Sequence, residues 1–259
     1  MKRYIKAAIL DISNESFDAK LEIAKDPNTP SDILAELAII DDYSKPTFSD
    51  TGELLEAIAK NPNTPAETLE FFLTDSYIKH LIPVKLGIAS NPNTSLDILN
   101  QLFLTGSHKV RELVAENPSI PIEFMQQLSQ DPDEDIRLGV VWNKNLTDDI
   151  ALSFLNDSSD SVREELALTN ELSPNVVATI LDSLYDDPCM DVRHSVTCNP
   201  MCTTSILHKL VTDSSALVRL GALCHKNIAD EDIMLCIDDP NPSVADIAHR
   251  ELQKRGIEV

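Results

Sequence analysis

One basic residue recurs at a fixed phase along this chain, and its spacing is regular enough to build a binding site. Each copy follows an apolar residue and stands six positions before a turn residue that is usually Asn. A guanidinium is a planar fork that holds a phosphate or a carboxylate with two parallel hydrogen bonds. The repetition predicts a row of cations along one face, spaced by the ~10 Å that packed helices allow. The row comprises Lys85, Arg111, Arg137, Arg163, Arg193 and Arg219.

Acidic turns recur beside this row and offer the cations partners inside the protein. Asp131, Asp157, Asp187 and Asp213 stand at equivalent turns. We expect each Arg to pair with a turn Asp of its own or an adjacent unit, which makes the row structural; a row that grips a ligand is the alternative. The turn asparagines are expected to satisfy backbone groups at helix ends. These are Asn61, Asn91, Asn117, Asn143 and Asn199.

The C-terminal cysteines and histidines are the other candidates for chemistry. Cys198 and Cys202 are four residues apart without a matching second pair, whereas zinc sites present paired ligands at characteristic spacings. The spacing therefore favours small buried thiols and surface histidines, and no cofactor is predicted. A metal or iron–sulfur centre built from this region is retained as an alternative. The residues concerned are His194, Cys198, Cys202, His208, Cys224 and His225.

The chain is strongly acidic, with 43 acidic and 21 basic residues and a net charge of −22. Such a field repels nucleic-acid phosphate, favours solubility and speeds encounter with a basic partner. We expect a solvated surface, with a partner-binding or DNA-mimicking face as the alternative. The acidic stripe predicted along the turns consists of Asp131, Asp133, Glu134, Asp135, Asp157, Asp160, Asp186, Asp187 and Asp191. The apolar contacts considered in its place are Trp142, Phe48 and Tyr43.

A repeat of 26 residues must position these groups. Such a period is typical of solenoids, in which units stack to bury a common core. Each unit is predicted to hold two short helices around an Asn-Pro turn, with Thr29, Thr64 and Thr94 as N-caps of the second helix. The polar segment 41–52 is predicted as a loop because it contains Pro and Gly. The expected organisation is a capping segment 1–18, a repeat array 19–252 and a tail 253–259.

These motifs resemble the leucine-rich repeat variant family, a helical relative in appearance of HEAT-type repeats. The resemblance rests on recurring Val-Arg, Asn-Pro and Leu-x-x-Leu, as in Val110–Pro118 and Asp131–Arg137. It implies a right-handed superhelix of α and 3₁₀ helices over roughly residues 19–252. Some members carry an N-terminal cysteine cluster that binds iron and sulfur. The first cysteine of this chain is Cys189, so that function does not transfer.

The sequence therefore predicts an all-α, right-handed α-solenoid of about eight to nine two-helix repeats. Its expected function is a non-enzymatic, cytoplasmic scaffold that binds another protein through its curved surface. The apolar stretch before Asp11 is too short for a signal peptide, and no run is long enough to span a membrane. An acidic DNA mimic is the first alternative and a metal protein the second. The partner and the oligomeric state are not predicted.

Overall fold

The computed structural model describes residue 12, residues 15–39 and residues 48–258, with the side chains of residues 48–50 left aside. Tyr43, the side chain of Phe48 and most of the predicted cap 1–18 lie outside these residues. All regular structure in the described part is helical. Its contacts divide the chain into two compact units, Met1–Met125 and Gln126–Val259. Each unit is described by itself.

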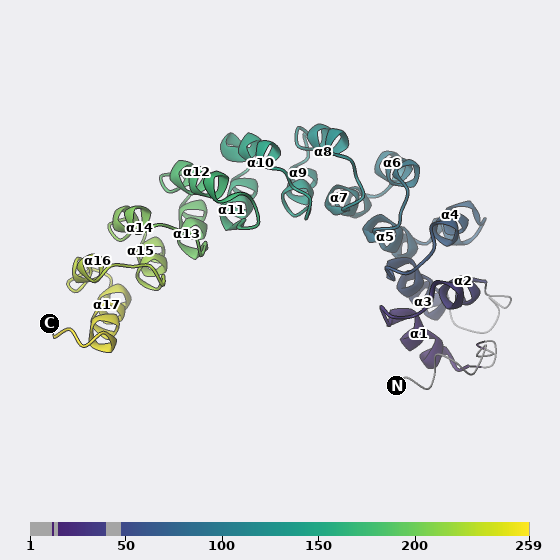
Figure 1. Ribbon diagram of the computed structural model, residues 1–259, viewed down its shortest axis with the longest axis horizontal. Helices are drawn as coiled ribbons and strands as arrows, with labels where there is room; N and C mark the ends of the chain where they lie inside the picture. The colour runs from purple at the N-terminus through teal and green to yellow at the C-terminus, as the bar shows by residue number, and fades with distance from the viewer. Residues whose placement is uncertain (1–11, 13–14, 40–47, 259) are drawn as a thin grey trace. The chain divides into compact units, whose positions relative to one another are not determined.

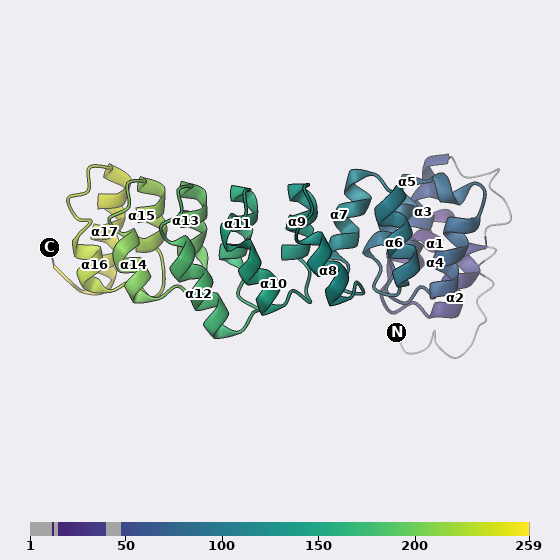
Figure 2. The ribbon, with the colours of Figure 1, turned by 90° about the horizontal axis from the view of Figure 1, so that it is seen from above.

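In the first unit, alternate helices form a row in which each contacts the next, and the intervening helices form a second row (Figures 1 and 2). The first row is α1 (Phe17–Lys25), α3 (Phe48–Lys60), α5 (Ile82–Ser90) and α7 (His108–Glu116). The second row is α2 (Ser31–Ala38), α4 (Ala66–Thr74) and α6 (Leu96–Thr105), with a 3₁₀ turn η2 (Ile78–His80) before α5. Helix α8 (Ile122–Leu128) spans the division between the units.

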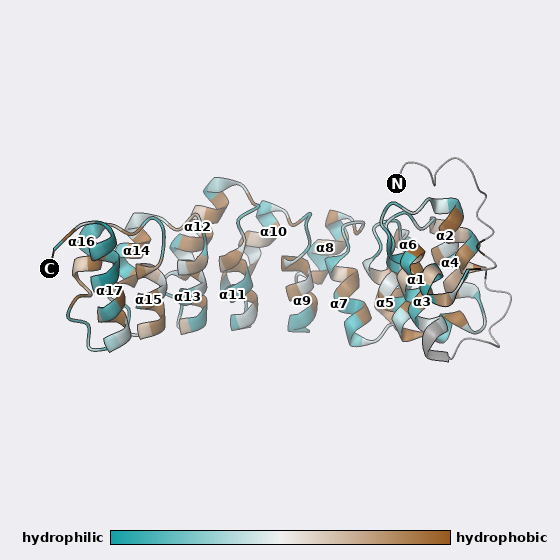
Figure 3. Ribbon diagram, turned by 90° about the horizontal axis from the view of Figure 1, so that it is seen from below, coloured by the Kyte–Doolittle hydropathy of each residue, from teal (hydrophilic) through white to brown (hydrophobic). Residues whose placement is uncertain are grey.

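The second unit repeats this alternation. Its first row is α9 (Glu134–Val141), α11 (Asp160–Leu168), α13 (Met190–Cys198), α15 (Ala216–Leu223) and α17 (Pro242–Lys254). Its second row is α10 (Asp148–Ser153) with η3 (Phe154–Asn156), α12 (Pro174–Leu184), α14 (Thr204–Leu210) and α16 (Asp230–Met234). Successive first-row helices contact one another, and each carries apolar and polar segments (Figure 3).

The core lies between the two rows of each unit. In α11, Val162, Leu166 and Ala167 are buried at helical spacing, and α12 buries Val177 and Leu181 against that layer. Because a helix of eight to eleven residues is marginal alone, the stacking of neighbours supplies most of its stability. None of the helices in the described part combines the length and apolar character that a bilayer crossing requires.

The predicted threonine N-caps are wrong. Helices α2 and α4 begin after a proline without a side-chain cap, and Ser95 caps α6 by accepting from the Ile98 N–H. The threonines instead close the preceding helix: Thr64 donates to the Ile58 carbonyl at 2.5 Å and Thr94 to the Ile88 carbonyl at 2.6 Å. The last carbonyls of a helix lack intrahelical donors, and in a buried turn the hydroxyl satisfies one of them.

The structure also changes two predicted boundaries. Helix α3 begins at Phe48, so residues 48–52 of the predicted loop are helical. Thr51, Leu54 and Leu55 are buried, and this packing outweighs the ~1 kcal/mol that a helical Gly costs. At the other end, α17 extends to Lys254, two residues into the predicted tail.

Gly87 allows close contact between α5 and α3. A Cβ added there would lie 2.7 Å from the Ala59 Cβ and 3.1 Å from the Glu56 carbonyl oxygen. We expect Gly87→Ala to lower the free energy of unfolding by about 1–3 kcal/mol, because backbone must shift to admit the methyl group. Ser90→Ala, on the same helix and half-exposed, should change it by less than ~1 kcal/mol. Urea unfolding followed by circular dichroism tests both; equal losses would contradict the close-contact explanation.

Candidate functional site

Four arginines of the predicted cation row form bidentate ion pairs, each with the turn aspartate of the next sequence repeat. The Arg137 Nε and Nη2 donate to the two carboxylate oxygens of Asp157, both at 2.7 Å. The other pairs are Arg163–Asp187, Arg193–Asp213 and Arg219–Asp239, each with an Nε–Oδ2 distance of 2.7 Å. Arginine side chains in the four pairs are 10–12% exposed and aspartate side chains 5–9%. The predicted pairing is confirmed for these arginines.

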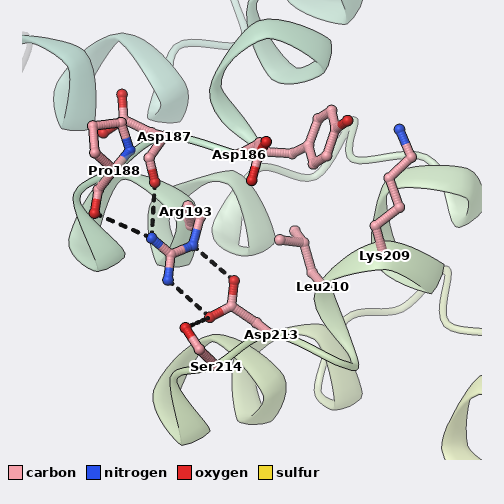
Figure 4. Close-up of a pocket in the computed structure, with 9 residues that line it drawn as sticks. Asp186, Asp187, Pro188, Arg193, Lys209, Leu210, Asp213 and Ser214 are labelled. Carbon is pink, nitrogen blue, oxygen red and sulfur yellow. Dashed lines mark hydrogen bonds and ion pairs between the residues drawn. The ribbon is translucent and has the colours of Figure 1, made fainter.

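Each arginine also binds the turn at the start of its own sequence repeat. This second contact joins the pairs into one continuous network. The Arg193 Nη1 donates to the Asp187 carbonyl at 2.8 Å, while its other edge holds the Asp213 carboxylate (Figure 4). Asp187 in turn accepts Arg163 on its carboxylate. An anion from solvent would have to displace a buried bidentate carboxylate to reach a guanidinium. This arrangement favours a structural role, and we name it the Arg–Asp ladder.

The ladder holds its carboxyl groups in the ionised form. Burial by itself would raise the pKa of Asp157, Asp187 and Asp213, but hydrogen bonds from the paired arginine and a backbone N–H two residues ahead outweigh it. The pKa of each group therefore lies below its ordinary value. For Asp239, the hydrogen bonds from Arg219 are the largest influence and lower the pKa in the same direction.

These directions predict how stability depends on pH. A carboxyl group with a lowered folded pKa contributes stability that is fully present above its unfolded pKa, ordinarily 3.8, and is lost as pH falls through the folded value. We expect the second unit to keep its stability from pH 7 to about pH 5 and to lose it below about pH 4. Urea unfolding followed by the fluorescence of Trp142, the chain's only tryptophan, reports this. A main loss above pH 5 would show that other groups dominate.

The remaining predicted site residues occupy different environments. The Arg111 guanidinium lies 4.9 Å from the centre of the Phe103 ring. Asp133 caps α9 by accepting from the Asp135 N–H, and Glu134 is exposed. The predicted acidic stripe needs correction, because Asp157 and Asp187 are buried in the ladder and present little charge to solvent. Asp160, Asp186 and Asp191 are exposed.

The turn asparagines satisfy backbone groups at helix ends, as predicted, and the structure shows that these groups belong to the preceding sequence repeat. The Asn91 Nδ2 donates to the carbonyls of Ala59 and Asn61 at 2.7 and 2.8 Å, and its Oδ1 accepts from the Asn93 N–H. Asn61, Asn117 and Asn199 bind the preceding sequence repeat in the same way. These side chains are at most 4% exposed, so they hold the stack together and are not available to a ligand.

His225 replaces asparagine in the last of these turns. Its Nε2 lies 3.1 Å from the Asn199 carbonyl, and its Nδ1 accepts from the Asn227 N–H at 3.1 Å. The ring thus donates on one side and accepts on the other, like the amide it replaces. His225 is therefore explained by the stack and supplies no ligand to a metal.

Two of the five cysteines are buried, two are exposed and Cys189 is half-buried. Burial raises the pKa of Cys202 to about 12 and also raises that of Cys236, so neither thiol is reactive. Cys198 and Cys224 are exposed, and the Cys198 Sγ lies 3.8 Å from the His194 Nε2. Within residues 126–258, no three His, Cys, Asp or Glu side chains bring ligand atoms close enough to share an ion.

Sequence reasoning named Trp142 as a possible apolar contact but missed the row of exposed side chains to which it belongs, on the first-row helices of the second unit. Each stands five residues after a ladder arginine, at the C-terminal end of its helix. Trp142 and Leu168 are 45% and 38% exposed, and the Trp142 Nε1 donates to Glu165 on the next helix at 2.9 Å. The sequence could have indicated the row, because each of these residues follows a ladder arginine by the same five positions. We name this set the apolar row: Trp142, Leu168, Cys198 and Cys224.

The apolar row is confined to the second unit. At the equivalent phase in the first unit stand Ser90 and Glu116, both polar. Between α13 and α15 the row borders a cavity of about 570 Å³, lined by residues that include His194, Cys198, Leu220 and Cys224. The arrangement provides a shallow, mostly apolar surface flanked by charges.

No protein-family model matches the chain. No curated protein matches it either. The resemblance to the leucine-rich repeat variant family therefore stays a prediction that rests on its motifs.

Proposed function

We propose that this chain is a non-enzymatic protein-binding module, built as a right-handed α-solenoid, whose second unit presents the binding surface. The apolar row carries the proposal. Trp142 and Leu168 remain exposed although every first-row helix buries apolar side chains a few residues earlier. Aromatic and aliphatic residues that gather on one exposed face are typical of protein interfaces. The ladder arginines, by contrast, already form ion pairs with aspartates of the same chain and are not available to a partner.

The composition supports a protein partner over nucleic acid. A net charge of −22 opposes contact with phosphate, and the cations of the ladder are neutralised. The five cysteines are free thiols, which fits a reducing compartment such as the cytoplasm.

A photo-crosslinking experiment tests the proposal. Benzoylphenylalanine placed at position 168 of the full chain should give defined adducts with a protein of the source cell under ultraviolet light. The matched control places it at Leu235, the C-cap residue that follows the second-row helix α16, where the side chain is 57% exposed. Adducts specific to position 168 support the proposal. Absence of adducts at both positions, with the protein folded, argues against it.

A second candidate, an acidic inhibitor that occupies a DNA-binding site, is favoured by the exposed carboxylates Glu134, Asp160 and Asp191 at the N-terminal ends of α9, α11 and α13. It would compete with DNA for its target, and the protein-binding module would not. Competition with a DNA duplex for the crosslinked partner separates the two functions.

The acidic end of α9 should influence how fast a basic partner associates. We expect the triple variant Asp133→Asn, Glu134→Gln and Asp135→Asn to slow association several-fold and to weaken its salt dependence, because exposed charges act within ~8 Å at physiological salt. Asn at position 133 can still cap α9, so the fold should be retained. Stopped-flow or surface plasmon resonance measurements with the crosslinked partner test this. Rates that respond neither to salt nor to the variant would show that these acids only solvate the surface.

A further inference from the structure

The apolar row has a repeat distance that limits what can bind it. It presents one side chain at the C-terminal end of each of α9, α11, α13 and α15, either the last helical residue or the C-cap, and these helices contact one another in sequence. Packed helices lie 8–10 Å apart. A ligand that uses the whole row must therefore repeat its own contacts at about that distance.

Three backbone conformations can be compared with this repeat. A polyproline-II segment returns to the same face every three residues, or about 9.3 Å, within the helix spacing. The side chains of a β-strand alternate between two faces. Side chains on one face therefore lie about 6.6 Å apart after two residues and about 13 Å apart after four, and neither distance matches the helix spacing. In an α-helix, a side chain returns to the same face after seven residues, or about 10.5 Å, which is slightly longer than the helix spacing. The polyproline-II conformation fits best.

Charged residues flank the apolar row, acidic on one side and basic on the other, and they determine where a ligand can carry its own charges. Exposed Glu134, Asp160 and Asp191 lie seven or eight residues before the row on their helices, about 10–12 Å away along the helix axis. On the opposite side, Lys144 and Lys226 stand two residues after Trp142 and Cys224. A long basic side chain beside each apolar contact would reach the acidic side.

The shallow, open cavity between α13 and α15 adds a second kind of contact beside the row. Its volume of about 570 Å³ exceeds that of one aliphatic side chain, and its walls are mostly apolar. Leu220 lines it beside the thiols Cys198 and Cys224, which behave as small apolar groups in such a wall. An aliphatic side chain in the cavity would remove this surface from water and anchor the segment.

We propose that the apolar row binds an extended, polyproline-II-like segment of a partner protein. The segment carries an aliphatic side chain at every third residue and a lysine or arginine beside it. This proposal rests on the proposed function, because it specifies the partner of the same surface. Four triplets span α9 to α15, and one aliphatic side chain enters the cavity.

Fluorescence anisotropy with a synthetic peptide tests this directly. The probe is a fluorescein-labelled peptide of four Leu-Lys-Pro triplets, added to the full chain at 150 mM salt. The control peptide has the same composition with its leucines in one block. We expect at least tenfold weaker binding of the control, at least tenfold weaker probe binding to Leu168→Asp, and no change for Leu235→Asp at the C-cap of α16. A peptide with leucine at every seventh residue, in a helix-forming sequence, tests the helical alternative.

The outcomes separate this inference from the proposed function. Equal binding of probe and control peptide, equal effects of Leu168→Asp and Leu235→Asp, or tighter binding of the helical peptide would overturn the extended-segment inference. If neither peptide binds while position 168 still crosslinks a cellular protein, the inference fails and the protein-binding function stands. If neither peptides nor cellular proteins are bound, both fail. Circular dichroism confirms that each variant is folded.

Discussion

Replacing Arg137 with alanine should lower the free energy of unfolding of the second unit by about 3–4 kcal/mol. The substitution removes two hydrogen bonds to the Asp157 carboxylate and one to the Asp131 carbonyl. Asp157 would keep its charge in a site where its side chain is 7% exposed. Breaking one partner of a buried pair costs more than the pair itself contributes, because the remaining ion stays desolvated. Chemical unfolding followed by Trp142 fluorescence measures the loss.

Two further variants distinguish the ladder from an ordinary surface pair. Arg137→Lys keeps the charge but cannot form the bidentate fork and the carbonyl bond together, so an intermediate loss is expected. Lys254→Ala removes the exposed pair with Glu251, in which the lysine side chain is 69% exposed, and should cost less than ~1 kcal/mol. If Arg137→Ala costs no more than Lys254→Ala but weakens partner binding, the ladder belongs to the binding surface.

Replacing Asn91 with alanine should destabilise the first unit by about 3–5 kcal/mol. The side chain is 0% exposed and satisfies two carbonyls and one N–H. Each buried polar group left without a partner costs about 1–3 kcal/mol, and water has poor access to this turn. Urea unfolding followed by far-ultraviolet circular dichroism measures the change, with the first unit's transition assigned by comparison with Trp142 fluorescence of the second.

Asn93→Ala provides the matched control two residues away. Its amide also binds two carbonyls of the preceding sequence repeat, those of Pro62 and Thr64, but the residue is exposed. Water can replace these bonds, so a loss of about 1 kcal/mol is expected. Similar losses for the two variants would show that the number of hydrogen bonds, and not their burial, sets the cost. Asn91→Asp should be at least as harmful as Asn91→Ala, because a carboxylate cannot donate to carbonyls.

The repeat phase allowed much of the structural framework to be predicted. Equivalent positions recur in equivalent environments, so the spacing of Arg, Asp and Asn was enough to predict the pairing of Arg163 with a turn aspartate and the backbone role of Asn91. The same reasoning was wrong for Thr64. A threonine before a proline matches an N-cap locally, but the stack buries it beside the open carbonyls of the previous helix. Local pattern could not distinguish these partners.

The sequence by itself determined that the described chain is helical and that its recurring Arg, Asp and Asn side chains are satisfied within it, because a fixed period of apolar, charged and amide side chains leaves few ways to satisfy them. Only the tertiary structure decided which charges face solvent and which apolar side chains remain outside the core. Asp157 and Asp160 are equally acidic in sequence, yet the side chain of Asp157 is 7% exposed beneath Arg137 and Asp160 is exposed. Leu166 and Leu168 are two residues apart on one helix, yet α11 buries the first and exposes the second. Exposure depends on the neighbouring helices, and that information is absent from any single repeat.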